Sequence, residues 1–247
     1  AYDSGVRDFM FTVHDRYFDL FDEIRRSRLF PGMFYTPCLP YAHKYWNMLS
    51  TGGPVNLLSN TFGHVNLFKL VPATISQLIG KPTALTELLC SVELLMCKGL
   101  PLRGVFLLNL AFDFLVAIEA YKYIESFEIV VRDRYRLTPG FFTMNHPHAT
   151  SVLCDRIGLE KPWLCANFNR AGFRMNPSQM EVENSFATGK TNNIAMSVFT
   201  GSQDSATALD YAIDHLKCRH FNSILFGSSN PVNIRINVDA IFAKSGN

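Results

Sequence analysis

The sequence predicts a (β/α)8 TIM barrel, an α/β fold that would use all of residues 1–247 as a single domain. Short apolar strand patterns alternate with longer helical patterns along the whole chain. A chain of 247 residues, 48% of them hydrophobic, is long enough to bury one large core. No low-complexity tract or linker divides it. A doubly wound open sheet is the alternative arrangement of the same elements.

The first half of the chain supplies four predicted strands, at residues 6–13, 33–36, 65–71 and 104–108. Apolar residues at helical spacing follow each strand, at residues 17–29, 42–49, 75–97 and 112–124. Gly80 and Pro82 are expected to interrupt the third of these helices.

The second half supplies four more predicted strands, at residues 140–144, 162–166, 193–199 and 222–226. The helices that follow are expected at residues 149–157, 179–186 and 206–216, with a last helix beginning at Pro231. Eight strands and eight helices are the number that closes a barrel.

The turn before the last helix is rich in hydrogen-bond donors, because it reads Gly227-Ser228-Ser229-Asn230. A helix amino terminus that follows such a turn presents free N–H groups and a positive dipole end, which suits a phosphate group. Ser and Asn are also ordinary capping residues, so a simple helix cap is the alternative interpretation.

In a parallel barrel the residues that follow the strands gather at one mouth, where catalytic groups of this fold are found. The predicted mouth contains His14, Asp15, Tyr41, His43, Lys69, Asn109, Asn145, His146, His148, Asn167, Asn169, Arg170, Thr200, Ser202, Ser228, Ser229 and Asn230.

Histidines at this mouth raise the question of a metal site, because His14, His146 and His148 could supply imidazole ligands. Asp15 is the only obvious carboxylate at a strand end, which argues against a hard divalent cation. We therefore expect no metal. The alternative role for the segment at residues 145–148 is a helix start that Asn145 caps, with both imidazoles facing solvent.

Lys69 and Tyr41 are the candidate reactive side chains. A lysine that points from an apolar strand into the mouth would have a lowered pKa, because desolvation disfavours its charge. It could then act as a base, form an imine or contact a phenol. A phenol beside this ammonium group would be a proton donor made more acidic by the lysine.

The segment GSSNPVNIRINV, which begins at Gly227, resembles the strand-to-helix segment with which aldo-keto reductases hold the adenosine end of NADP(H). Residues 140–169 look like the fifth and sixth strands of that family. The resemblance covers the pattern of residues 100–244. It implies a cofactor site for NADP(H) or NAD(H) formed by Asn145, Asn167, Ser197, Ser228, Ser229, Asn230 and Asn237.

The catalytic set of that family is an Asp, a Tyr, a Lys and a His. The corresponding residues here are Thr36, Tyr41, Lys69 and Asn109, so the Tyr and Lys match while the Asp and His do not. At the cofactor site Asn145 matches an amide that contacts the nicotinamide carboxamide, and Met144 replaces the Ser that precedes it. Asn233 stands where an NADP-selecting Arg often lies, with Arg235 close by.

The resemblance implies an NAD(P)H-dependent oxidoreductase that acts on a small carbonyl or alcohol. The proposed catalytic residues are Tyr41, Lys69, Asn109, Asp15 and His14. One alternative is a cofactor-independent lyase, aldolase or isomerase that uses Lys69 with Asp15 or His14. Another is a non-catalytic barrel that binds a partner through its apolar surface.

Composition narrows the partners and the location. A net charge of +2 leaves no charge pattern typical of nucleic-acid or membrane binding, so we expect a small-molecule substrate. Six scattered cysteines without CxxC spacing predict buried thiols in the reducing cytoplasm. No membrane span or signal peptide is visible, and both a missing amino-terminal segment and a homo-oligomer are left open.

Overall fold

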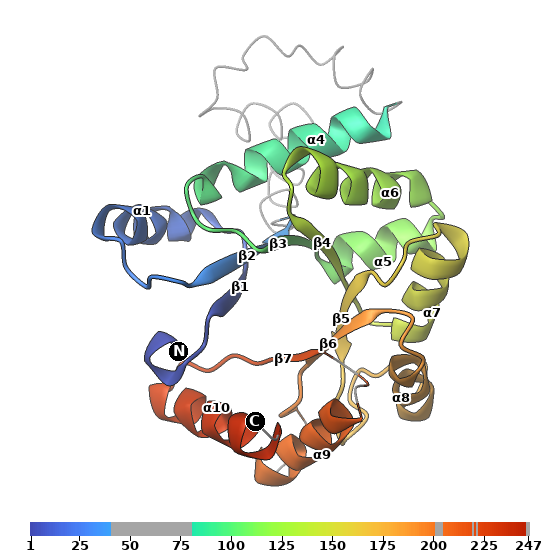
Figure 1. Ribbon diagram of the computed structural model, residues 1–247. Coiled ribbons are helices and arrows are strands. Elements are labelled where there is room, and N and C mark those ends of the chain that lie inside the picture. Colours follow the sequence, from blue (N-terminus) through green and yellow to red (C-terminus); the bar gives the residue numbers. More distant parts are fainter. Residues whose placement is uncertain (41–80, 201–204, 219, 221, 246–247) are drawn as a thin grey trace, which may run out of the picture. The chain divides into compact units, whose positions relative to one another are not determined.

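The computed structural model describes residues 1–40, 81–200, 205–218, 220 and 222–245 (Figure 1). The chain divides into two compact units. Unit 1 consists of Ala1–Asp8, Phe112–Ile118 and Gly140–Asn247. Unit 2 consists of Phe9–Ala111 and Glu119–Pro139.

Unit 2 contains three strands in the order β1-β2-β3, namely β1 (Asp8–Thr12, in this unit from Phe9), β2 (Phe34–Leu39) and β3 (Gly104–Leu107). β2 and β3 are parallel, with Cys38 opposite Phe106. The α-helices are α1 (Phe18–Ser27), α4 (Pro82–Glu93) and α6 (Tyr121–Ile129). Shorter helical turns are η2 (Asp15–Tyr17), η3 (Leu94–Cys97) and the π-helical η4 (Val130–Arg134).

Aromatic rings fill the core of unit 2 beside α1. The ring of Phe21 contacts those of Phe11 and Tyr35, with centroid distances of 4.9 and 6.1 Å. Phe21 and Ile24 are buried one turn apart on the same face of α1, as the helical spacing in the sequence predicts. Burial of these rings therefore holds α1 against the strands.

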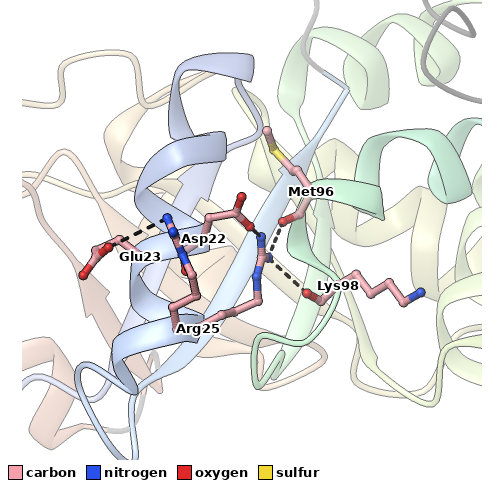
Figure 2. A network of polar contacts seen from close by, with 6 residues as sticks. Asp22, Glu23, Arg25, Met96 and Lys98 are labelled. Atoms are coloured by element: carbon pink, nitrogen blue, oxygen red, sulfur yellow. Dashed lines mark hydrogen bonds and ion pairs between the residues drawn. The ribbon is translucent and has the colours of Figure 1, made fainter.

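Arg25 joins α1 to the segment that precedes β3 (Figure 2). Its Nη1 donates to the carbonyl oxygens of Met96 and Lys98, both at 3.0 Å, and its Nη2 bonds the carboxylate of Asp22. Carbonyl groups at the end of a helix lack intrahelical donors, so a guanidinium is a suitable partner for them.

Unit 1 contains four parallel strands in the order β4-β5-β6-β7. They are β4 (Thr138–Thr143, in this unit from Gly140), β5 (Trp163–Asn167), β6 (Asn192–Met196) and β7 (Ser223–Leu225). The helical elements are η1 (Tyr2–Ser4), α5 (Asn109–Ala117, in this unit from Phe112), α7 (His146–Thr150), η5 (Ser151–Arg156), α8 (Gln179–Ala187), α9 (Ser205–Lys217) and α10 (Pro231–Ser245).

The described structure confirms the predicted alternation of parallel strands and helices. Seven strands lie in the described residues, so the closed eight-stranded barrel and the single domain stay predictions. The strand expected at residues 65–71 and the helix expected at 42–49 lie outside the described residues. None of the described helices is both long and apolar enough to cross a membrane.

The continuous helix expected at residues 112–124 is wrong. The chain forms α5 and α6 instead, and Glu119 between them has a left-handed φ of 55°. That conformation cannot continue a right-handed helix.

All six cysteines are free thiols. The prediction that they are buried is confirmed for Cys38, Cys90, Cys97 and Cys165, and it is wrong for Cys218, which is exposed. Burial raises the pKa of both Cys90 and Cys97 to about 12, so these two remain protonated thiols at neutral pH.

Candidate functional site

The candidate site is the carboxyl end of β4 to β7 in unit 1. On β5, Ala166 packs in a core with Phe186 of α8 and Ala212 of α9. Successive side chains of a strand point to opposite faces, so Cys165 and Asn167 face away from these helices. Asn167 therefore stands at the strand end on the face that α8 and α9 do not cover.

The end of β4 is held by a carboxylate from α5. Thr143 Oγ1 donates to Asp113 Oδ1 at 2.7 Å, and the backbone N–H of Met144 donates to Asp113 Oδ2 at 2.9 Å. The N–H of Asn145 donates in turn to Thr143 Oγ1 at 3.0 Å. Burial raises the pKa of Asp113, while these two donors and the charge of His148 lower it.

Met144 and Asn167 connect the ends of β4 and β5. Thr143 pairs with Ala166, and one residue further along Asn167 Nδ2 lies 3.1 Å from Met144 Sδ. The same nitrogen donates to the carbonyl oxygen of Arg174 at 3.2 Å. No described residue donates to the side-chain oxygen of Asn167, which leaves an acceptor at this edge.

Asn145 is positioned by its own helix. Its side-chain oxygen accepts a hydrogen bond from the N–H of His148 at 3.2 Å, which confirms the predicted cap of α7. No described residue accepts from its side-chain nitrogen. That nitrogen is therefore an available donor at the carboxyl end of β4.

The loop after β5 has a fixed shape because of Asn169, which is fully buried. Its Nδ2 donates to the carbonyl oxygen of Phe173 at 2.9 Å, and the N–H of Phe173 donates back to its Oδ1 at 2.8 Å. Phe173 and Arg174 are exposed, with the guanidinium carbon 5.1 Å from the centre of the ring. The loop thus presents an aromatic ring and a cation beside Asn167.

Ser197 directly follows β6 and adopts a left-handed backbone, with φ at 59°. Its carbonyl oxygen accepts from the N–H of Thr200 at 3.0 Å. A non-glycine residue in this conformation costs energy and often marks a turn with a specific role. The strand expected to reach residue 199 therefore ends at Met196.

The turn after β7 caps α10, with Pro231 as its first residue as predicted. Asn230 Oδ1 accepts from the N–H of Val232 at 2.9 Å, and Ser228 Oγ accepts from the N–H of Asn230 at 3.0 Å. The side chain of Asn230 is thus engaged in a helix cap. Ser229 is exposed, and Asn237 lies two turns further along α10, partly exposed.

His146 is buried, so the expectation that its imidazole faces solvent is wrong; His148 is exposed as expected. The ring nitrogens of His146 lie 2.9 Å from Ser185 Oγ and 2.8 Å from Asn193 Oδ1. Burial lowers the pKa of His146 to about 4, which keeps the ring neutral. Both ring nitrogens have hydrogen-bond partners, which indicates that His146 has a structural role between the sheet and the helices that cover it.

Three of the proposed catalytic residues, His14, Asp15 and Asn109, lie in the described part of unit 2. His14 precedes η2 and its Nδ1 accepts from the N–H of Arg16 at 3.1 Å, while Asp15 is the first residue of η2. Asn109 begins α5 and belongs to unit 2. Tyr41 and Lys69 lie outside the described residues, so their roles stay predictions.

Asp113 is the residue of this site that the sequence interpretation missed. Asp113 carried a signal, because it is a carboxylate between two phenylalanines in the apolar run NLAFDFLVA. A charge in such a run needs a partner when the helix packs on a sheet.

Chemically, the side chains at this edge are mostly neutral amides and hydroxyls, with Arg170 and Arg174 in the loop after β5. Such a set can hold a carboxamide or a phosphate. Among the described residues no group of three His, Cys, Asp or Glu side chains could hold a metal ion.

Comparison with solved structures finds a protein from Pseudomonas aeruginosa that is named, provisionally, as an aldo-keto reductase. The TM-score is 0.49 at 12% sequence identity, and the match covers 66% of this chain and 60% of that chain. No family model matches the sequence, and no curated protein matches it. The likeness is too distant to show family membership or activity.

Proposed function

We propose that the carboxyl ends of β4 to β7 bind NADP(H) or NAD(H), and that the protein is an oxidoreductase acting on a small carbonyl or alcohol. The observation that carries the proposal is a row of neutral hydrogen-bonding groups at the end of parallel strands. No described residue bonds the amide nitrogen of Asn145 or the amide oxygen of Asn167, so they offer a donor and an acceptor at the ends of neighbouring strands. Ligands of open and closed α/β sheets bind at this edge.

The donor and acceptor suit the nicotinamide end of the cofactor. A carboxamide needs both a donor for its oxygen and an acceptor for its nitrogen, and the two asparagines can provide them. Ser197 would contribute a hydroxyl at the end of the next strand. Because amides carry no charge, this contact would be insensitive to pH near neutrality.

The amino terminus of α10 suits the phosphate end. The side chain of Asn230 accepts a hydrogen bond from the N–H of Val232. Ser228 and Ser229 lie in the same turn, and both carry hydroxyl groups. The helix has 15 residues, so its dipole favours an anion at this end. Asn237 and Arg235 would lie near the adenosine, where the arginine would favour NADP(H).

When bound, the cofactor would supply or accept a hydride. Tyr41 would give the substrate oxygen its proton, and the Lys69 ammonium would lower the pKa of that phenol. Asn109 replaces a histidine of the resembled family and would orient the substrate oxygen as a neutral donor. A cytoplasmic location is part of the proposal, supported by six free thiols in the chain.

A charge introduced at the phosphate end tests the proposal. Ser228→Asp should weaken NADPH binding at least about tenfold, because a carboxylate would face the cofactor phosphate. Ser223→Asp is the matched control, since the same change there lies at the amino end of β7. Calorimetric titration measures both. Equal affinity of the two variants would show that the cofactor phosphate does not bind at this turn.

A further inference from the structure

We infer that Asp113 is a positioning residue for the nicotinamide end of the site. The inference rests on the proposed function and adds a residue from α5 to it. Asp113 accepts from two groups at the end of β4, the hydroxyl of Thr143 at 2.7 Å and the N–H of Met144 at 2.9 Å. Two consecutive residues of the strand end are thus bound by one carboxylate.

The contacts reach the site through the backbone. Thr143 is buried, and its oxygen also accepts from the N–H of Asn145 at 3.0 Å. Three consecutive residues, from Thr143 to Asn145, therefore have their orientation set by the Asp113 carboxylate or by the hydroxyl that it holds. Asn145 provides the free amide donor of the proposed site.

The same contacts set the second amide of the site. Met144 Sδ accepts a hydrogen bond from Asn167 Nδ2, so the position of Met144 helps to fix the orientation of the Asn167 amide. The nitrogen of Asn167 is engaged by Met144 and Arg174, and no described residue bonds its oxygen. Asp113 thereby influences both the donor and the acceptor of the proposed carboxamide contact.

Asp113 acts from the helix side of the sheet and does not itself face the ligand. Phe141 contacts Phe112 of α5, with ring centroids 5.1 Å apart, so the alternate residue Thr143 also faces α5. Met144 consequently points to the opposite face, where Asn167 lies. This geometry separates the carboxylate from the reacting atoms and makes it a positioning residue.

A series of variants separates positioning from general stability. Asp113→Ala removes both acceptors, and Thr143→Val removes the hydroxyl while keeping the side-chain shape. Asp113→Asn is the rescue variant, because its oxygen can accept from the Met144 N–H while its nitrogen donates to Thr143 Oγ1. Val116→Ala is the matched control, since Val116 is buried on the same helix and contacts no site residue through a hydrogen bond.

Two measurements are made on each variant and on the unchanged protein. NADPH affinity is measured by calorimetry, and the side-chain amide signals of Asn145 and Asn167 are followed by NMR without ligand. We expect Asp113→Ala and Thr143→Val to shift both amide signals and to weaken NADPH binding about tenfold, as the loss of about 1.4 kcal/mol in contact energy would. Asp113→Asn should retain most of the affinity, and Val116→Ala should lose stability only.

The outcomes distinguish this inference from the proposed function. Absence of NADPH binding to the unchanged protein would overturn the proposed function and this role together. Binding by the unchanged protein, with equal affinity and unmoved amide signals in Asp113→Ala and Val116→Ala, would overturn the positioning role alone. If Asp113→Ala does not fold, the same comparison is decided by Thr143→Val.

Discussion

Thr143 Oγ1 lies 2.7 Å from Asp113 Oδ1, and this hydrogen bond joins residues 30 positions apart in the sequence. It connects the end of β4 to α5 at the edge where the site is proposed. A helix that packs on a sheet through apolar side chains can slide or rotate, whereas a directional bond between two polar side chains fixes one arrangement. The contact therefore links the position of α5 on the sheet of unit 1 to the geometry of the candidate site.

The buried phenol of Tyr35 gives a prediction about stability. Its hydroxyl is buried, and no described residue bonds it. Tyr35→Phe should leave the free energy of unfolding unchanged or raise it by about 1 kcal/mol, because an unsatisfied polar group is removed. Urea unfolding measures the change.

Tyr211→Phe is the matched control for this prediction. The Tyr211 hydroxyl donates to Glu183 and accepts from Gln179 at 3.3 Å. Its removal should cost about 1 kcal/mol. A larger loss for Tyr35→Phe than for Tyr211→Phe would show that the Tyr35 hydroxyl has a stabilising partner.

His146 predicts a dependence of stability on pH. Its pKa is about 4 in the folded chain, against 6.5 for an unperturbed imidazole. Above pH 6.5 the imidazole is neutral in both the folded and the unfolded chain, so its titration does not change the free energy of unfolding. As the pH falls below 6.5 the unfolded chain binds a proton that the folded chain does not, so stability is lost down to a pH near 4.

The expected loss from this group is about 2 kcal/mol between about pH 7 and pH 5. Urea unfolding at the two pH values should show this loss in the unchanged protein and a smaller one in His146→Gln. His148→Gln is the control, because that side chain is exposed. Equal pH dependence in all three proteins would contradict the assignment of His146 as a buried neutral histidine.

Arg25 predicts a stability difference within one helix. Arg25→Met removes donors from the carbonyl oxygens of Met96 and Lys98 and should cost about 1 to 2 kcal/mol. Arg26→Met removes an exposed ion pair with Glu23, 3.9 Å long, and should cost less than about 0.5 kcal/mol. Thermal or urea unfolding of both variants measures the two losses of stability. Similar losses would mean that the contacts of Arg25 with the carbonyl groups contribute little.

Local signals in the sequence accounted for much of the fold. The apolar run of β5 and the donor-rich turn before Pro231 are features of neighbouring residues, so the strand, the turn and the start of α10 could be predicted. Asn145 could likewise be predicted as a cap, because its partner is three residues away.

The errors came from residues whose neighbours in space are distant in sequence, and from one backbone conformation that the residue type does not signal. His146 was expected in solvent because its partners, Ser185 and Asn193, lie 39 and 47 residues away. The break between α5 and α6 falls at Glu119, where a left-handed backbone would ordinarily be signalled by glycine. Asp113 was missed because only the packing of α5 against β4 reveals its role.

The central claim, that the carboxyl ends of β4 to β7 bind a nicotinamide dinucleotide, is tested most directly by calorimetric titration of the unchanged protein with NADPH and with NADH. The account predicts saturable binding of one dinucleotide per chain. It also predicts broadened or shifted NMR signals of the Asn145 and Asn167 side-chain amides in the complex. Absence of heat and of any amide shift at millimolar concentrations of both dinucleotides would contradict it.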